Sequence, residues 1–134
     1  MENKELIEKA LDVREKSYSP YSKFKVGACL EAEDGSIYCG CNVENASYSV
    51  TNCAERTAFF QAISQGVTRF QKIAIVGGHD KADEFCPPCG VCRQVMMEFC
   101  NPDTFEIILG KEDLSYQSYT LRELLPLGFG PNNL

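Results

Sequence analysis

The sequence predicts an α/β fold, a three-layer α-β-α sandwich in which helices cover both faces of a mixed five-stranded sheet. The 134 residues are just under the length of one typical domain, and 44% hydrophobic with 24% charged residues is an ordinary globular composition. A hairpin pattern is followed by alternating helical and strand patterns, which is typical of a mixed sheet between helices. We find no internal repeat or linker, so residues 1–134 are predicted to form a single domain.

The first element is predicted to be a helix. Asn3 is a suitable N-cap, and apolar residues follow it at helical spacing until the segment 19–22, Ser-Pro-Tyr-Ser, ends the pattern. Residues 26–32 and 37–42 are predicted as two strands, because Asp34-Gly35 between them is a strong hairpin signal.

Helices and strands are then predicted to alternate to the C-terminus. After a polar loop at 45–52, Thr51 or Asn52 is expected to cap a helix over about 53–65, which Gly66 ends. Pro87-Pro88 opens a helix that extends through Phe99. The remaining elements are three short strands and a last helix, at 73–76, 105–109, 116–120 and 121–125.

The charge balance argues against several kinds of partner. The formal net charge is −6, and such a surface repels a phosphate backbone, so we expect no nucleic-acid and no anionic membrane partner. No apolar stretch approaches the ~20 residues that span a bilayer, and the N-terminal segment lacks the apolar centre of a signal peptide. We therefore expect a cytoplasmic protein.

The cysteines restrict the chemistry further. Eight cysteines in a chain of this length are too few for a disulfide scaffold, and in a cytoplasmic protein metal or redox chemistry is the more common use. Four of them fall in predicted strands or on a helix and are interpreted as packing residues: Cys29, Cys39, Cys41 and Cys100.

Three other cysteines lie at predicted helix starts. Cys53 is at the start of one helix, and Cys89 and Cys92 are at the start of another. The Cys-x-x-Cys spacing lets two thiolates reach one metal, and helix N-termini in one α/β layer can converge to add the third. Three thiolates on Zn²⁺ leave the fourth tetrahedral position to water, which is the pattern of catalytic sites. The sequence therefore predicts one zinc ion per chain.

Glu55 and Arg56 directly follow the first of these cysteines. Glu55 is too close to Cys53 to be a comfortable second ligand, but it is well placed to move protons beside the metal. Three thiolates and one Zn²⁺ leave a net negative charge, which we expect the helix N-termini and Arg56 to offset.

Other interpretations of these cysteines stay open on spacing alone. A single Cys-x-x-Cys pair also occurs in structural zinc and redox sites. The run that begins at Cys86 resembles part of an iron–sulfur motif, although Met96 stands where the ferredoxin pattern requires a further cysteine. A closed structural zinc site of four cysteines is the more serious alternative, made of Cys53, Cys86, Cys89 and Cys92.

At these motifs the sequence resembles a known family. CAERTA at 53–58 and PCGVCRQV at 88–95 are similar to the two zinc motifs of the small homotetrameric cytidine deaminases. FKVGA at 24–28, NVENASY at 42–48 and the segment 123–131 agree in order and spacing, so the resemblance runs from about Tyr18 to the C-terminus. One departure is Pro87, where the family usually has serine, and Cys86 adds a thiol without an assigned role.

The resemblance implies roles for individual residues in the metal centre and around the substrate. Cys53, Cys89 and Cys92 would be the zinc ligands, and Glu55 would be the proton shuttle. The residues implied around the substrate are Phe24 beside the pyrimidine, Asn42 and Glu44 on the ribose hydroxyls, Ala54 offering backbone groups to the base, and Tyr48 near the sugar. Without the resemblance, Asn42 and Glu44 are equally well explained as polar residues that end a strand.

The activity that the resemblance implies is zinc-dependent hydrolytic deamination of cytidine and 2′-deoxycytidine to the uridines, with release of ammonia, as in pyrimidine salvage. Glu55 would take a proton from water activated by the metal, and no organic cofactor is implied. Phe129 matches an aromatic residue that reaches the base in a neighbouring subunit, which implies a homotetramer with shared active sites. The alternatives are a deaminase of a related aminopyrimidine nucleoside and a zinc-stabilised binding module without turnover.

Overall fold

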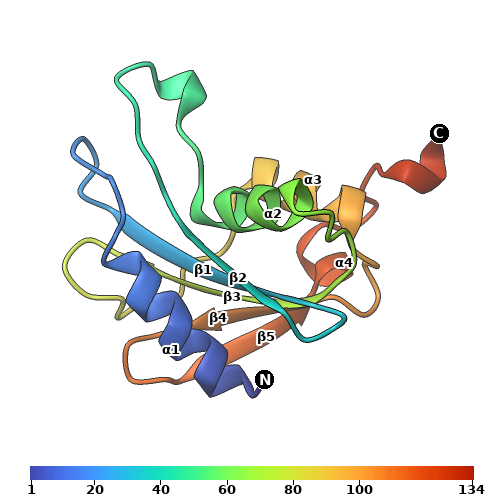
Figure 1. Cartoon of the computed structure of the whole chain (residues 1–134), viewed down its shortest axis with the longest axis horizontal. Helices are drawn as coiled ribbons and strands as arrows, with labels where there is room; N and C mark the ends of the chain where they lie inside the picture. The colour runs from blue at the N-terminus through green and yellow to red at the C-terminus, as the bar shows by residue number, and fades with distance from the viewer.

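A five-stranded sheet in the order β2-β1-β3-β4-β5 organises the computed structural model, which describes all 134 residues (Figure 1). The strands are β1 (Lys25–Ala32), β2 (Ile37–Cys41), β3 (Phe70–Gly78), β4 (Glu106–Gly110) and β5 (Tyr116–Thr120). Only β3 and β4 are parallel, and the other neighbours are antiparallel. The predicted mixed sheet and the predicted order of elements are therefore confirmed.

Helices cover both faces of this sheet (Figure 1). Helix α1 (Asn3–Arg14) lies on one face, and α2 (Ala54–Ser64) and α3 (Gly90–Phe99) lie on the other. The short α4 (Leu121–Leu124) follows β5, and two 3₁₀ helices, η1 (Tyr48–Val50) and η2 (Pro131–Asn133), lie in the connections. None of the helices has the length and apolar character needed to cross a membrane.

Two hydrophobic cores fill the spaces between these layers. The larger core packs α2, α3 and α4 against the sheet around Phe59, and the smaller core packs α1 against the other face. Successive residues of β1 alternate between them, with Ala28 and Leu30 in the larger core and Cys29 in the smaller. Burial on both faces explains why β1 and β3 are apolar runs without the polar alternation of a half-exposed sheet.

The cap predicted for the first helix is wrong. The N-cap of α1 is Glu2, and Asn3 is already helical. The Asn3 side chain instead links the helix to the sheet, because its amide donates to Glu106 at 3.1 Å and its Oδ1 accepts from Lys72 at 2.9 Å. The Asn3 side chain, which the local sequence suggests as a cap, therefore makes tertiary contacts instead.

The cap predicted for the second helix is also wrong, since Cys53 is the N-cap of α2. The side chains of the predicted caps are used elsewhere: Thr51 Oγ1 accepts from the Asn45 amide at 3.2 Å, and Asn52 Nδ2 donates to Thr57 Oγ1 at 3.1 Å. The helix consequently begins with the sulfur of Cys53 at its N-terminus.

Cys29 and Cys39 correct the interpretation of the strand cysteines. They lie opposite each other in the β1–β2 register and form a disulfide, whereas the sequence analysis treats both as packing residues. Their Cα atoms are 4.2 Å apart, as in the closely spaced, non-hydrogen-bonded pairs of an antiparallel ladder, which brings the two side chains within reach of a disulfide. Cys41 and Cys100 are free, and Cys100 is buried in the larger core, as expected of a packing residue.

Candidate metal centre and active-site cavity

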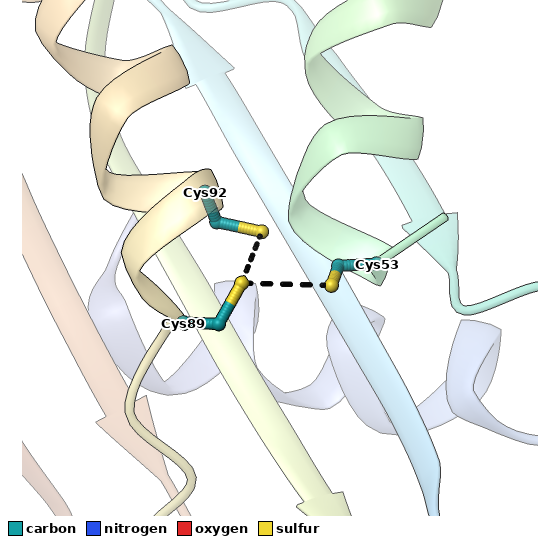
Figure 2. Close-up of side chains that lie close together, drawn as sticks. All are labelled: Cys53, Cys89 and Cys92. Atoms are coloured by element: carbon teal, nitrogen blue, oxygen red, sulfur yellow. Dashed lines mark hydrogen bonds between the residues drawn. The ribbon is translucent and has the colours of Figure 1, made fainter. Parts of the chain in front are cut away.

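The three cysteines predicted to bind metal lie together at the N-termini of α2 and α3 (Figure 2). Cys53 is the N-cap of α2, Cys89 is the N-cap of α3, and Cys92 lies in the first turn of α3. The Cys53 and Cys89 sulfurs are 3.8 Å apart, those of Cys89 and Cys92 are 3.5 Å apart, and all three lie within 4.8 Å of one another. Two helix ends that are remote in sequence therefore build one three-thiol cluster.

The geometry of this cluster fits zinc. Tetrahedral Zn²⁺ with Zn–S bonds of about 2.3 Å has sulfurs about 3.8 Å apart, close to the separations between these thiols. Cys86 is not part of the cluster, so the four-cysteine site considered from the sequence is not formed. Three sulfur donors provide the coordination of a zinc ion that keeps one position open, at one ion per chain.

Arg56 contributes positive charge directly to the cluster. Its Nη2 donates to Cys53 Sγ at 3.1 Å, which is the contact expected for an offset of thiolate charge. The pKa of Cys53 is lowered to about 5, because the Cys92 thiol and the Arg56 guanidinium both stabilise its thiolate. The pKa of Cys92 is raised, since it faces the Cys53 thiolate and is removed from water. A divalent cation relieves this conflict by replacing the remaining thiol protons.

Glu55 stands beside the cluster in the first turn of α2 and is only 5% exposed. Burial raises the pKa of its carboxyl to about 7, and the negative charge on Cys53 acts in the same direction. A carboxyl group that titrates near neutral pH can both accept and donate a proton, which is the requirement for a general acid–base group.

A cavity of about 340 Å³ opens over Glu55 and the cluster. Its size is at the small end of the range for sites that enclose small molecules. Most of the residues predicted for the site line it, namely Phe24, Asn42, Glu44, Cys53, Ala54, Glu55 and Cys89. Cys92 is buried behind them. The segment before β1, the end of β2 and the two helix N-termini thus meet at one place.

Asn42 is occupied by bonds to its own chain. Its Nδ2 donates to the Phe24 carbonyl at 2.8 Å, its Oδ1 accepts from the Val26 amide at 2.9 Å, and Ser17 Oγ also donates to that oxygen. The side chain is therefore a brace for the strand start that carries Phe24. Both lone pairs of the amide oxygen are thus occupied, and the second N–H of Nδ2 is the remaining donor of this side chain, which lines the cavity.

Glu44 holds the preceding loop in the same manner. Its carboxylate accepts from the backbone amides of Tyr21 at 3.0 Å and Ser22 at 3.1 Å, and from Ser22 Oγ. The bond from Ser22 Oγ is the main reason that the pKa of Glu44 is lowered, so the group is ionised. A carboxylate has about four acceptor positions, which leaves capacity for a ligand hydroxyl.

Tyr48 and Phe129 do not line the cavity within one chain. Tyr48 lies in η1, is 65% exposed, and contacts the ring of Tyr21 at a centroid distance of 6.4 Å. Phe129 is 58% exposed and precedes η2 in the C-terminal segment, which extends away from the sheet (Figure 1). Both aromatic side chains are therefore available to contacts outside their own chain.

Two positioning residues were missed in the sequence. Ser22 joins Glu44 to Phe24, because its Oγ also accepts from the Phe24 amide at 3.0 Å. Arg93 fixes the loop before Cys89, since its Nε donates to the Pro88 carbonyl at 2.8 Å and its Nη1 to Leu124 O at 2.6 Å. Nearness to the motifs is their only signal in the sequence, because both act on backbone groups that only the fold brings within reach.

Comparison with known proteins gives a consistent result. A family model described as the cytidine and deoxycytidylate deaminase zinc-binding region matches residues 1–107. A cytidine deaminase from Sporosarcina psychrophila is 48% identical over 136 residues, covering 100% of this chain and 96% of that protein. A cytidine deaminase from Halalkalibacterium halodurans is 48% identical over 129 residues, covering 96% of this chain and 95% of that protein.

Solved structures extend the similarity to the fold. The crystal structure of cytidine deaminase from Burkholderia pseudomallei has a TM-score of 0.87 at 46% identity, covering 96% of this chain and 100% of that one. The structure of cytidine deaminase from Mycobacterium tuberculosis has a TM-score of 0.81 at 35% identity, covering 97% of this chain and 98% of that one. Sequence and fold are thus similar over essentially the same residues.

Proposed function

The chain belongs to the cytidine and deoxycytidylate deaminase zinc-binding family, and we propose that it hydrolyses the free nucleosides cytidine and 2′-deoxycytidine to the corresponding uridines and ammonia. It is a zinc-dependent hydrolase, and cytidine deamination is the activity of the relatives that it matches over their full length. One observation carries the proposal: Cys53 and Cys89 of the three-thiol cluster and the buried Glu55 carboxyl line one cavity of about 340 Å³.

Glu55 is proposed as the group that moves protons. Zinc held by Cys53, Cys89 and Cys92 supplies Lewis acidity, which makes water nucleophilic near neutral pH. Glu55 takes one proton from the water that attacks C4 and delivers it to N3 of the base. It then takes the second proton from the hydroxyl formed on C4 and delivers it to the amine, which leaves as ammonia while the C4 carbonyl forms. Its pKa of about 7 lets the same carboxyl hold a proton between these transfers.

The remaining lining residues are proposed to orient the nucleoside. Phe24 covers one face of the pyrimidine, the backbone of Ala54 meets the edge of the base, and Asn42 with Glu44 receives the ribose hydroxyls. The ionised Glu44 favours a free nucleoside over a nucleotide, because a phosphate near this carboxylate and a chain of net charge −6 would be repelled.

Phe129 is proposed to complete the site of a neighbouring chain in a homotetramer. The C-terminal segment exposes Phe129 at 58%, Leu127 at 100% and Leu134 at 98%, and contact with another subunit would remove this apolar surface from water. Burial of one such aromatic side chain is worth about 1.5–3 kcal/mol, enough to affect substrate binding.

A subunit-mixing experiment tests the shared site. Glu55→Ala and Phe129→Ala chains are each expected to be impaired, and refolding them together with zinc should create some sites with both residues intact. The mixture should then exceed the summed turnover of its two parents at equal chain concentration. If it does not, although mass spectrometry detects hybrid oligomers, Phe129 acts within its own chain.

The function itself is tested by ammonia release from the purified protein. We expect turnover of cytidine and 2′-deoxycytidine that chelation removes and zinc restores, with much less from cytosine or cytidine 5′-monophosphate. Faster turnover of the monophosphate would contradict the nucleoside proposal. Zinc binding without turnover of any aminopyrimidine nucleoside would identify a structural zinc module instead.

A further inference from the structure

Arg14 is a buried arginine that the proposed reaction does not use. It is the last residue of α1 and is only 5% exposed. Its Nε donates to the carbonyl of Lys25 at 3.1 Å, and its Nη2 donates to the carbonyls of Gly78 at 2.8 Å and Asp80 at 3.1 Å. One guanidinium thus joins three backbone carbonyls from two segments that are far apart in the sequence.

These carbonyls lie on either side of an aromatic contact. Lys25 follows Phe24, and Gly78 and Asp80 flank His79. The rings of Phe24 and His79 meet edge to face with their centroids 5.1 Å apart. Lys25 and Gly78 form the last residue pair of the β1–β3 ladder, so Phe24 and His79 lie just beyond the last sheet pairing.

Phe24 is also the wall between two cavities. On one side is the cavity over Glu55, and on the other is a second cavity of about 330 Å³ that His79 and the following loop line. The backbone of Phe24 is fixed by Ser22 and Asn42, but its ring needs support on the side away from the substrate. His79 provides that support.

We propose that Arg14 is a positioning residue for substrate binding: by holding the 78–80 turn against the start of β1, it keeps His79 behind Phe24 and so sets the Phe24 ring in the nucleoside site. The planar guanidinium suits this role because its donors point in fixed directions, which the single ammonium of lysine cannot reproduce. The inference rests on the proposed function only in assigning Phe24 to the nucleoside.

The expected effect is on substrate binding and not on proton transfer. Arg14 belongs to α1, on the face of the sheet opposite α2 and α3, and makes no contact with the cysteine cluster or Glu55. A displaced Phe24 ring weakens substrate and transition state alike, which raises KM and leaves kcat unchanged. Misplacing a positioning group by about 1 Å can cost up to about 100-fold in catalytic rate. Because Arg14→Lys removes only part of the support of Phe24, we expect KM to rise by about tenfold.

The test compares Arg14→Lys with Arg122→Lys, because Arg122 makes an exposed ion pair with Asp103 remote from the cavity. Arg14→Lys should raise KM for cytidine about tenfold with kcat within about twofold and zinc content unchanged, whereas Arg122→Lys should match the parent. His79→Ala, which leaves the three carbonyl contacts intact, should raise KM in the same way. A parental KM in either Arg14→Lys or His79→Ala would overturn the proposal.

A second readout does not require turnover. His79 is the only histidine of the chain, so its imidazole protons give isolated NMR signals that the Phe24 ring current displaces. Phe24→Leu defines the position of these signals without that ring, and Arg14→Lys should move them toward it. Unchanged signals in Arg14→Lys would contradict the proposal. These signals report on the role of Arg14 even if cytidine is not the substrate. Failure of the Arg14 proposal can therefore be distinguished from failure of the proposed function.

Discussion

The two faces of the sheet each carry a group of cysteines, and the two groups have opposite chemistry. On the face covered by α1, Cys29 and Cys39 form a disulfide. On the face covered by α2 and α3, the Cys53, Cys89 and Cys92 thiols stay free, although neighbouring sulfurs are only 3.5 and 3.8 Å apart. Proximity of sulfur atoms alone therefore does not decide the outcome.

The difference lies in the backbone that carries each group. Strand register brings two sulfurs face to face at the edge of an apolar core, and this pair is not part of a cluster that could hold a metal. Helix N-termini converge at a point, so they bring three sulfurs together, and their partial positive charge and Arg56 stabilise thiolates. One arrangement favours a covalent pair, and the other favours a metal ion.

Removal of a thiol from the cluster of Cys53, Cys89 and Cys92 should have the largest effect. Cys89→Ala leaves two sulfur donors, so we expect loss of zinc and of detectable cytidine turnover. Cys86→Ala is the matched control, since Cys86 lines the cavity but lies outside the cluster, and it should retain one zinc per chain. Metal analysis of the two purified variants checks the prediction, and loss of zinc from Cys86→Ala would restore the four-cysteine site.

Glu55→Gln should have the next largest effect, because it removes the proton carrier without removing a ligand. We expect turnover to fall by about 10⁴ or more, since general acid–base catalysis is worth about 10²–10⁴ and one group serves several transfers here. Zinc content should be unchanged. Glu98→Gln, an exposed carboxylate on α3, controls for the loss of charge. A Glu55→Gln enzyme with a tenth of parental activity would contradict the mechanism.

Cys39→Ala removes the Cys29–Cys39 disulfide and leaves the three-thiol cluster intact. A disulfide that closes a loop with a sequence separation of 10 should contribute about 2–3 kcal/mol to the free energy of unfolding. Denaturant unfolding of Cys39→Ala against the parent measures this loss, while zinc content and kcat should remain at parental values. A fall in zinc content would mean that the two faces are not chemically independent.

Arg56→Gln should give the smallest change. It removes one charged hydrogen bond to the Cys53 sulfur, and such bonds contribute about 1.5–3 kcal/mol, so zinc should bind about tenfold or more weakly. Competition with a chelator measures the affinity, with Arg122→Lys as the surface control. Equal zinc affinity in Arg56→Gln and parent would show that the helix N-termini alone stabilise the thiolates.

The sequence predicted the three-thiol cluster but not the Cys29–Cys39 disulfide, and the reason is physical. The metal motifs are local: Cys89 and Cys92 are one helical turn apart, and Glu55 and Arg56 directly follow Cys53. The disulfide depends on which residues of β1 and β2 face each other, and that register is a property of the paired strands. The same limit applies to Arg14 and Arg93, whose carbonyl partners are distant in sequence.

Element order was likewise predictable where patterns were local. The Asp34-Gly35 hairpin and the apolar runs identified β1 to β4, whereas β5, predicted at 116–120, is a polar strand without such a run. The caps were wrong because Asn3, Thr51 and Asn52 are equally able to make tertiary or loop hydrogen bonds, and local sequence carries no information on which partner is present.

Mass spectrometry of the native and the denatured chain tests the central contrast most directly. Native spectra should contain one zinc ion per chain, and the denatured, zinc-free chain should be lighter than the fully reduced chain by two hydrogen atoms, with the missing pair mapped to Cys29 and Cys39. This result would mean that Cys29 and Cys39 are covalently paired while Cys53, Cys89 and Cys92 bind the metal. A native chain without zinc whose missing hydrogens map to Cys53, Cys89 or Cys92 would contradict the account.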